Sequence, residues 1–228
     1  MRFRGLPWRG TRLSRGGEPG DRRLRAMAPC PAVILVRHGC TALDAKGCLS
    51  GRINVGLDAT GRDEAAALGS DLAVSRMAGI VTSPMKCAIE TADAVAALHP
   101  GVRVEEDARL LERDCGQWAG RPRAELLAAY PDEDSAPDVE PRAAFDERVF
   151  RAFARAAERA IVAESVVVLV THDAVIRTIL TTVIGLQPKG GWRQQTGCWS
   201  RVERASEGGW VATVVDCKPT TRPFTIAP

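Results

Sequence analysis

Short apolar runs alternate along this chain with segments in which apolar residues recur at helical spacing. Two runs, 32–36 (AVILV) and 166–170 (VVVLV), are apolar throughout, which is typical of strands buried on both faces of a sheet. Further strands are expected at 79–82, 102–105, 198–203 and 210–215, the last two joined by Glu207-Gly208-Gly209. Helices are expected at 60–75 (with Thr60 as N-cap), 86–98, 143–163 and 174–184.

This alternation predicts an α/β fold, a three-layer α/β/α sandwich with a mostly parallel central sheet. One domain is expected over residues 31–219, followed by a C-terminal tail at 220–228. Within the domain, residues 119–142 contain four prolines around a short helix near 125–130. Because prolines interrupt regular structure, this segment is expected to be an irregular excursion over the sheet edge that serves as a lid.

Residues 1–30 differ from the rest in charge. The first 26 residues hold eight arginines against Glu18 and Asp21, a net charge of +6, and lack sustained apolar periodicity. A disordered basic extension is therefore expected. It has no apolar segment of the secretory type. Two origins remain open: an organellar targeting peptide, or an upstream extension, since translation from Met27 would begin almost at the first strand.

The remainder of the chain carries 23 basic and 26 acidic residues, so it is mildly acidic although the whole chain is at +3. This balance argues against nucleic-acid binding by the domain. The sequence contains no stretch of 18 apolar residues, so no membrane span is expected. The seven cysteines form neither CxxC pairs nor clusters with histidine. No metal site is therefore expected, and the cysteines are predicted to be reduced thiols in a cytoplasmic protein.

Chemistry-bearing residues follow directly after the two most apolar runs. Arg37-His38-Gly39 comes after 32–36, and Thr171-His172-Asp173 comes after 166–170. Ligands of open α/β sheets bind at the carboxyl ends of strands. Since two of the three histidines occupy equivalent positions there, we expect them to meet at one site.

The residue types around His38 suit attack on phosphorus. An imidazole nitrogen is nucleophilic only when unprotonated, and the guanidinium of Arg37 favours that neutral state while offering a planar fork to phosphoryl oxygens. Gly39 is expected to permit close approach of the backbone to the ligand, and Thr41 to supply a hydroxyl donor. His172 would hold the remaining oxygens. A carboxylic acid must then protonate the leaving alkoxide.

Five blocks of sequence occur in order along the chain: V-R-H-G-x-T (36–41), Gly51 with L-D-A-T-G (57–61), S-P-M-K-C-A-I-E-T-A (83–92), L-L-E-R-D-C-G-Q-W-A-G (110–120) and V-T-H-D (170–173). Together they resemble the histidine phosphatase superfamily, in its phosphoglycerate-mutase-like branch. The resemblance spans about residues 32–217. Five blocks in order are far more specific than a single short motif.

The resemblance implies a catalytic group made of His38, Arg37, His172 and Glu112. His38 is the nucleophile that becomes phosphohistidine, Arg37 and His172 bind the phosphoryl group, and Glu112 is the proton donor. Water then hydrolyses the intermediate, and no metal or organic cofactor is expected. The resemblance also implies a homodimer, although no residue identifies its interface.

The chain departs from the family pattern at three positions. Cys87 stands where the family has a second phosphate-binding arginine, Asp44 where it often has asparagine, and Cys48 where an arginine is common. Losing a cation and gaining a carboxylate each weaken the binding of a dianion. Cations that would compensate are Lys86, Arg52, Arg121 and Arg123. Asp44, Arg52 and Cys87 are accordingly placed among the substrate-binding positions, with Arg37, Gly39 and Thr41.

The predicted function is a metal-independent phosphomonoester hydrolase acting on a small phosphorylated metabolite. The block G-C-W-S (197–200) is similar to α-ribazole phosphatases, so a nucleotide-like cobalamin precursor is one candidate substrate, beside sugar and other nucleoside phosphates. Two alternatives stay open. One is a phosphoglycerate-type mutase; the other is a catalytically weakened relative that binds phosphorylated ligands or a partner protein.

Overall fold

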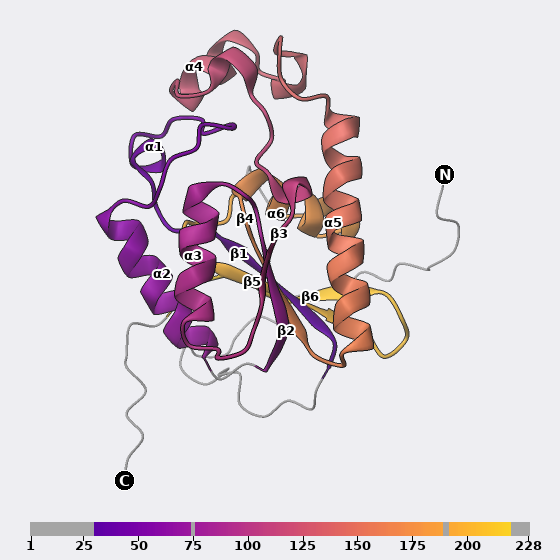
Figure 1. Cartoon of the computed structure of the whole chain (residues 1–228). Coiled ribbons are helices and arrows are strands. Elements are labelled where there is room, and N and C mark those ends of the chain that lie inside the picture. Colours follow the sequence, from indigo (N-terminus) through magenta and orange to yellow (C-terminus); the bar gives the residue numbers. More distant parts are fainter. Residues whose placement is uncertain (1–29, 74–75, 189–191, 220–228) are drawn as a thin grey trace.

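The computed structural model describes residues 30–73, 76–188 and 192–219, which form a layered α/β domain around a six-stranded sheet (Figure 1). The strands lie in the order β3-β2-β4-β1-β5-β6. Their bounds are β1 Ala32–Arg37, β2 Met77–Thr82, β3 Val104–Glu106, β4 Val166–Thr171, β5 Trp199–Arg204 and β6 Trp210–Cys217. Strands β1 to β4 are mutually parallel where they pair, and β5 runs antiparallel to both β1 and β6. The mostly parallel sheet expected from the sequence is confirmed.

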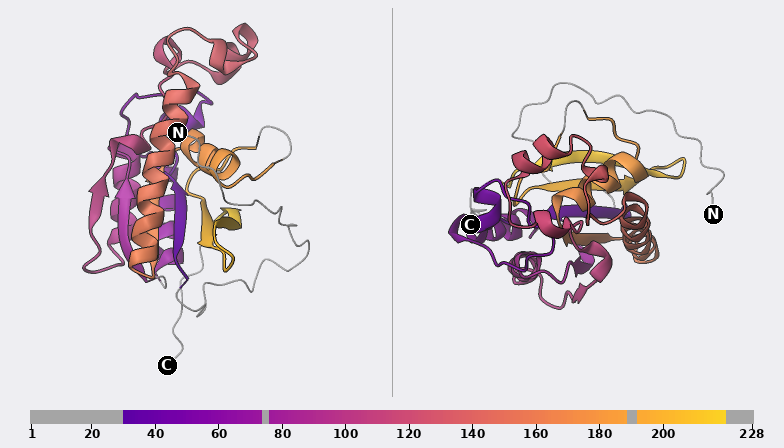
Figure 2. Two further views of the ribbon diagram at one scale, coloured as in Figure 1. Left: turned by 90° about the vertical axis from the view of Figure 1, so that its right-hand side faces the viewer. Right: turned by 90° about the horizontal axis from the view of Figure 1, so that it is seen from above.

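Helices cover both faces of this sheet (Figure 2). The α-helices are α1 Ala42–Ala45, α2 Ala59–Leu72, α3 Lys86–Ala96, α4 Arg123–Ala129, α5 Arg142–Val162 and α6 Asp173–Thr178, the last continuing as the π-helical turn η4 Ile179–Val183. Short 3-10 turns are η1 Ala108–Leu110, η2 Gly116–Trp118 and η3 Glu133–Ser135.

The alternation of side chains along β1 explains the three layers. Val33 and Leu35 belong to the core under α5 and α6, whereas Ile34 and Val36 belong to the core under α2 and α3, and all four are fully buried. Successive side chains of a strand point to opposite faces, so a strand covered on both faces must be apolar at every position. The unbroken apolar runs in β1 and β4 are therefore a direct consequence of this packing.

The structure corrects several expected boundaries. Helix α2 is capped by Asp58 rather than Thr60: the Asp58 side chain accepts from the Gly61 N–H at 2.8 Å. Strand β3 begins at Val104, later than expected, and the one-turn helix α1 was not expected at all. The helix expected at 174–184 starts at Asp173 and becomes π-helical from Ile179.

The segment 119–142 is short-helical and irregular, as predicted, and lies beyond the carboxyl ends of the parallel strands, at the top of Figure 1. Backbone hydrogen bonds join it to the loop at residues 47–49. They run from Leu49 N to Arg121 O (2.9 Å), from Gly120 N to Leu49 O (2.7 Å) and from Arg123 N to Gly47 O (3.1 Å). Its action as a lid remains a prediction.

The predicted disordered extension lies, up to residue 29, outside the described residues, as do the predicted tail 220–228 and the end of the helix expected at 60–75. Among the described helices, none combines the length and the apolar character needed to cross a membrane.

Candidate active site

Strands β1 and β4 place the two histidines side by side. Arg37 and Thr171 are partners in the parallel pair, and the His38 N–H donates to the Thr171 carbonyl at 3.0 Å. The rings of His38 and His172, each one residue further on, have centroids 5.0 Å apart at an interplanar angle of 62°. The expected meeting of the two histidines at one sheet edge is thus observed.

The hydrogen bond of His38 defines its tautomer. Its Nδ1 lies 2.8 Å from the carbonyl oxygen of Gly39. A carbonyl can only accept, so Nδ1 carries the proton and Nε2 carries the free lone pair. Burial lowers the pKa of His38, and the nearby Arg37 lowers it further against the opposing charge of Asp44. The ring is therefore held neutral at physiological pH.

His172 is held from the opposite side by Ser83, at the end of β2. The Ser83 hydroxyl lies 2.8 Å from His172 Nε2, while Nδ1 is buried without a hydrogen-bond partner in the described part of the chain. Burial, followed by the proximity of His38 and Arg37, lowers the pKa of His172 well below its usual value. Ser83 received no role in the sequence analysis, although it opens the S-P-M-K-C-A block.

Arg37 is engaged differently from the expectation. One terminal nitrogen donates to the Gln194 carbonyl at 2.7 Å and the other to Asp44 at 2.5 Å, leaving its buried Nε without a partner among the described residues. Asp44 also accepts from the Thr41 hydroxyl at 2.7 Å and from the Thr41 N–H at 3.1 Å. The Thr41 hydroxyl, expected to bind ligand, here closes the capping box of α1, and Asp44 binds Arg37.

Packing of two backbone segments requires a glycine at position 39, and its role beside a ligand stays a prediction. A Cβ on Gly39 would lie 2.3 Å from the Gly61 carbonyl oxygen, and a Cβ on Gly61 would lie 2.0 Å from the Cys40 carbonyl oxygen. The glycines of R-H-G and L-D-A-T-G therefore let two backbones touch. The block around α3 supports the same loop, because the Gly39 N–H donates to Thr91 Oγ1 at 3.1 Å.

Glu112 lies in the loop between η1 and η2 and lines the cavity beside His38. Burial and the negative charge of Asp173 raise its pKa, despite the Arg113 N–H that donates to the carboxyl at 2.8 Å. Both causes disfavour the carboxylate. Glu112 therefore holds a proton more readily than an ordinary glutamate, as suits an acid catalyst.

Arg148 on α5 fixes the backbone that presents Glu112. Its terminal nitrogens donate to the carbonyls of Arg109 (2.8 Å), Leu111 (2.7 Å) and Glu112 (3.1 Å), and its side chain pairs with Glu140 at 2.7 Å. The sequence analysis missed this residue. In the sequence, Arg148 is one of several arginines in the helix expected at 143–163, and nothing there distinguishes it from the others.

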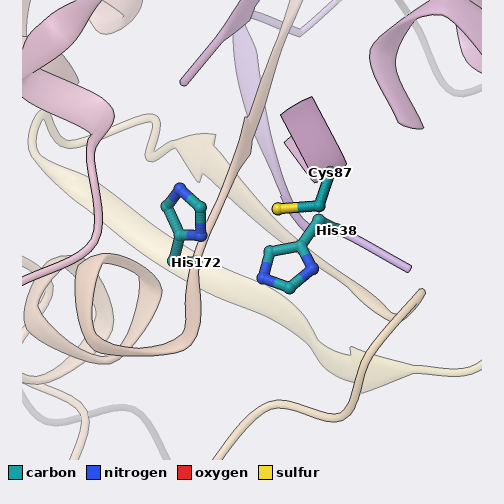
Figure 3. A group of neighbouring side chains, drawn as sticks. All are labelled: His38, Cys87 and His172. Carbon is teal, nitrogen blue, oxygen red and sulfur yellow. The ribbon is translucent and has the colours of Figure 1, made fainter. Parts of the chain in front are cut away.

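Cys87 lies in the first turn of α3 and is 2% exposed. Its Sγ belongs to a group with one ring nitrogen each of His38 and His172, and these three atoms lie within 4.8 Å of one another (Figure 3). Burial raises the pKa of this thiol to about 12, and Asp44 and Glu112 add to that effect. The position is thus next to the histidines, as the resemblance implied, but it contributes no positive charge.

A cavity of about 430 Å³ opens beside His38. This volume is within the usual range for a small-molecule site. Its wall includes Arg123, Leu126, Glu133 and Val139 from the predicted lid segment. Cys48, named as the place of a common family arginine, also lines it.

Besides Arg37, four arginines line this cavity: Arg113, Arg123, Arg177 and Arg193. Arg123 pairs with Glu133, and Arg193 pairs with buried Asp173 at 2.8 Å, whereas Arg177 forms no ion pair with any described residue. Burial, together with the charges of Arg193 and Arg177, lowers the pKa of Arg123 to about 10. The charges of Asp173 and Glu112 act in the opposite direction on Arg123, so the cation of this group that lacks an ion-pair partner among the described residues is Arg177.

Of the cations expected to compensate for Cys87, only Arg123 lines the cavity. Arg52 pairs with Asp114 at 3.6 Å and Glu140 at 3.5 Å outside the wall, and Arg121 pairs with Glu125 and stacks over Trp118. Lys86 faces Glu90 at 3.9 Å. The cations that replace them, Arg177 and Arg193, come from segments that the motifs do not mark.

The G-C-W-S block does not contact the cavity. Cys198 and Trp199 are buried, and the Trp199 indole donates to Asp71 at 2.8 Å, on the α2 side of the sheet. The lining residues nearby are Gln195 and Thr196, just before the block. This block therefore gives no structural support to an α-ribazole substrate.

These features define an α/β domain with a buried pair of histidines, an arginine and a carboxylic acid at the carboxyl ends of the parallel strands. Residues 33–217 match the model of the histidine phosphatase superfamily (branch 1), and the chain belongs to that family. The phosphatase class predicted from the sequence is confirmed at the level of the family.

Two relatives similar in sequence agree with this assignment, and a solved structure shares the fold. The chain is 32% identical over 178 residues to the uncharacterized phosphatase PhoE of Bacillus subtilis, covering 77% of this chain and 90% of that protein. It is 33% identical over 99 residues to the glucosyl-3-phosphoglycerate phosphatase of Mycolicibacterium vanbaalenii, covering 43% and 44% of the two chains. The structure of the α-ribazole phosphatase from Shigella flexneri aligns with a TM-score of 0.69 at 24% identity, over 82% of this chain and 96% of that one.

Proposed function

We propose that this enzyme hydrolyses a phosphomonoester through a phosphohistidine at His38 Nε2, and that the organic part of its substrate carries a second negative charge. The observation that carries the first part is the hydrogen bond from His38 Nδ1 to the Gly39 carbonyl. It leaves the Nε2 lone pair free in a ring that burial keeps neutral.

Two buried nitrogens that have no hydrogen-bond partner among the described residues support the binding of the transferring phosphoryl group. They are Arg37 Nε and His172 Nδ1. If the Ser83 hydroxyl donates to His172 Nε2, then Nδ1 carries a proton that is available to a phosphoryl oxygen. Such preorganised donors stabilise charge on the equatorial oxygens as it develops.

In the first step, His38 Nε2 attacks phosphorus and the bond from phosphorus to the ester oxygen breaks. Glu112 gives its proton to the departing alkoxide and becomes a carboxylate. In the second step, this carboxylate takes a proton from water as the water oxygen attacks phosphorus. The N–P bond breaks, phosphate leaves, and His38 and protonated Glu112 are restored.

The second part of the proposal depends on Arg123, Arg177 and Arg193. A neutral sugar or base would leave the charge of Arg177, and its repulsion with Arg123, uncompensated in the cavity wall. A carboxylate or second phosphate on the substrate would relieve it, and Arg177 is free to form a bidentate contact with either group. A phosphorylated acid or a bisphosphate therefore fits the cavity better than a phosphate ester without further charge.

The same arginines are also compatible with the mutase alternative. Arg113, Arg123, Arg177 and Arg193 all line the cavity, a richer basic group than the sequence motifs suggested. A mutase needs such a group to hold its substrate while the phosphoryl group returns to a second hydroxyl. Hydrolysis and transfer differ in their product, so inorganic phosphate and an isomerised ester distinguish them directly.

The test is phosphate release from a neutral aryl phosphate, from phosphorylated carboxylic acids and from bisphosphates, with H38A as the inactive reference. H99Q is the matched control, because His99 is the remaining histidine and is also buried but lies outside the cavity wall. We expect release by wild type and H99Q and none by H38A. Equal release by H38A, or no release by folded wild type on any substrate, would refute the hydrolase.

Substrate class is tested by Arg177→Gln. Loss of one charge-assisted contact costs about tenfold or more in binding. The ratio of kcat/KM for the doubly charged substrates to that for the aryl phosphate should fall by about this factor, whereas exposed Arg155→Gln on α5 should leave the ratio unchanged. An unchanged ratio in Arg177→Gln would contradict the proposal that the substrate carries a second negative charge.

A further inference from the structure

The group formed by Cys87 and the two active-site histidines has a composition found in metal sites. Each side chain comes from a different part of the sheet edge: His38 after β1, Cys87 after β2 at the start of α3, and His172 after β4. All three are buried, and their potential ligand atoms lie within 4.8 Å of one another. In Figure 3 the Cys87 sulfur is directed toward the space between the two rings.

The hydrogen bonds of both rings match those of metal-bound histidines. A ligating histidine usually donates its other ring N–H to a carbonyl or a similar acceptor, which fixes the ring. His38 Nδ1 donates to the Gly39 carbonyl at 2.8 Å, and His172 Nε2 lies 2.8 Å from the Ser83 hydroxyl, which can accept from it. In this tautomer of His172, the alternative to the one that donates to a phosphoryl oxygen, Nδ1 presents a lone pair to a cation, as does Nε2 of His38.

The spacing is close to that of a zinc site. Tetrahedral Zn²⁺ with one thiolate and two imidazoles separates its ligand atoms by about 3.3–3.6 Å. The potential ligand atoms here lie within 4.8 Å of one another, so side-chain movements of roughly 1 Å would bring them to the zinc spacing. One cysteine with two histidines and an open fourth position resembles three-ligand zinc sites that keep a place for water.

We propose that His38, Cys87 and His172 bind a thiophilic divalent cation such as Zn²⁺, and that this cation blocks the phosphatase by occupying His38 Nε2. On binding, the Cys87 thiol loses its proton to solvent and its sulfur bonds the metal. A metal on Nε2 and a phosphoryl group on Nε2 exclude each other. The blocking part rests on the proposed function, whereas binding of the cation does not.

The property depends on the residue that departs from the family pattern. An arginine at position 87 would offer no ligand atom and would place a positive charge beside the site, which disfavours a cation. The sequence shows no metal-ligand spacing because the three residues are 49 and 85 positions apart along the chain. The fold alone brings them together.

Binding is tested by titrating the full chain with Co²⁺, whose bond to a thiolate gives a near-ultraviolet charge-transfer band. We expect such a band in wild type, its displacement by Zn²⁺, and its loss in Cys87→Ala, Cys87→Ser and H38A. The matched control is Cys198→Ala, because Cys198 is also buried and burial likewise raises its thiol pKa to about 12, but it lies outside the group. Circular dichroism checks that each variant is folded.

A band that persists in Cys87→Ala or in H38A, or that is lost in Cys198→Ala, would overturn the site, as would the absence of any band in wild type. Inhibition is measured separately with Zn²⁺ and an aryl phosphate. The half-inhibiting Zn²⁺ concentration should rise at least about tenfold in Cys87→Ala and stay unchanged in Cys198→Ala. A cobalt band in a protein that releases no phosphate would uphold binding and refute the phosphatase, so the two failures are distinguishable.

Discussion

Arg37 and Asp44 form an ion pair of 2.5 Å beside the nucleophile, with side chains that are 14% and 12% exposed. This pair occupies a terminal nitrogen of the arginine that the sequence assigned to the phosphoryl group. A phosphate dianion must therefore compete with the Asp44 carboxylate for Arg37, or bind through the Nε that is left over.

Asp44→Asn should strengthen the enzyme. Asparagine can still accept from Thr41 and so preserve the cap of α1, but it removes the negative charge that competes with phosphate. We expect kcat/KM to rise about five- to thirtyfold, corresponding to about 1–2 kcal/mol. Asp44→Ala, which also loses the bond from the Thr41 N–H to the side chain of residue 44, is the comparison and should gain less. A fall in kcat/KM for Asp44→Asn would contradict the competing role of this carboxylate.

Gly61→Ala should destabilise the domain severely. Its Cβ would lie 2.0 Å from a backbone oxygen of Cys40, and a backbone cannot rotate aside as a side chain can. We expect a loss of about 3 kcal/mol in the free energy of unfolding, measured with urea. The control is Gly209→Ala, where φ is +82° but nothing lies within 4 Å, so a loss of only about 1 kcal/mol is expected. Equal losses would refute the backbone contact.

Asp173→Asn should move the whole pH profile of kcat/KM to lower pH. The Asp173 charge raises the pKa of Glu112 and also that of His38. Activity requires neutral His38 and protonated Glu112, so the acid limb follows His38 and the alkaline limb follows Glu112. Removing the charge lowers both pKa values, and both limbs shift in the same direction. Glu158→Gln, on α5 and outside the cavity wall, should leave both limbs in place; an upward shift in Asp173→Asn would refute the assignment.

Arg148→Met tests whether this residue positions Glu112. Without its guanidinium, three carbonyls of the Glu112 loop lose their donor. A misplaced acid slows proton transfer without removing phosphate contacts, so kcat should fall about tenfold to a hundredfold while KM changes little. Arg151→Met is the control on the same helix, because Arg151 is exposed and pairs only with Glu147 among the described residues. A rise in KM with normal kcat would indicate a binding role instead.

The strands and the paired histidines were predictable because burial on both faces leaves a strong mark on sequence. Strands β1 and β4 are apolar at nearly every position, and a parallel register carries the residues after them to one edge. His38 and His172 therefore followed from the pattern alone. Glu112 needed the family resemblance, since a glutamate in a loop is ordinarily a solvated charge.

The electrostatics of the cavity were not predictable in the same way. Arg177 and Arg193 lie in a helix and in a loop that no motif marks, and only folding brings them to Arg123. The pairing of Asp44 with Arg37 depends on side-chain geometry within one turn. Charged groups have no periodic pattern that reports their partners, whereas apolar positions do.

The central claim is that His38 Nε2 accepts the phosphoryl group. The most direct measurement is rapid quenching of turnover at alkaline pH, where phosphohistidine survives, followed by peptide mass spectrometry to locate the added phosphoryl group. The account predicts that it is found on the His38 peptide in wild type and H99Q, in larger yield in Glu112→Gln if that variant slows hydrolysis of the intermediate more than its formation, and on no peptide in H38A. A phosphoryl group on another residue, or phosphate release with none trapped on His38 in any variant, would contradict it.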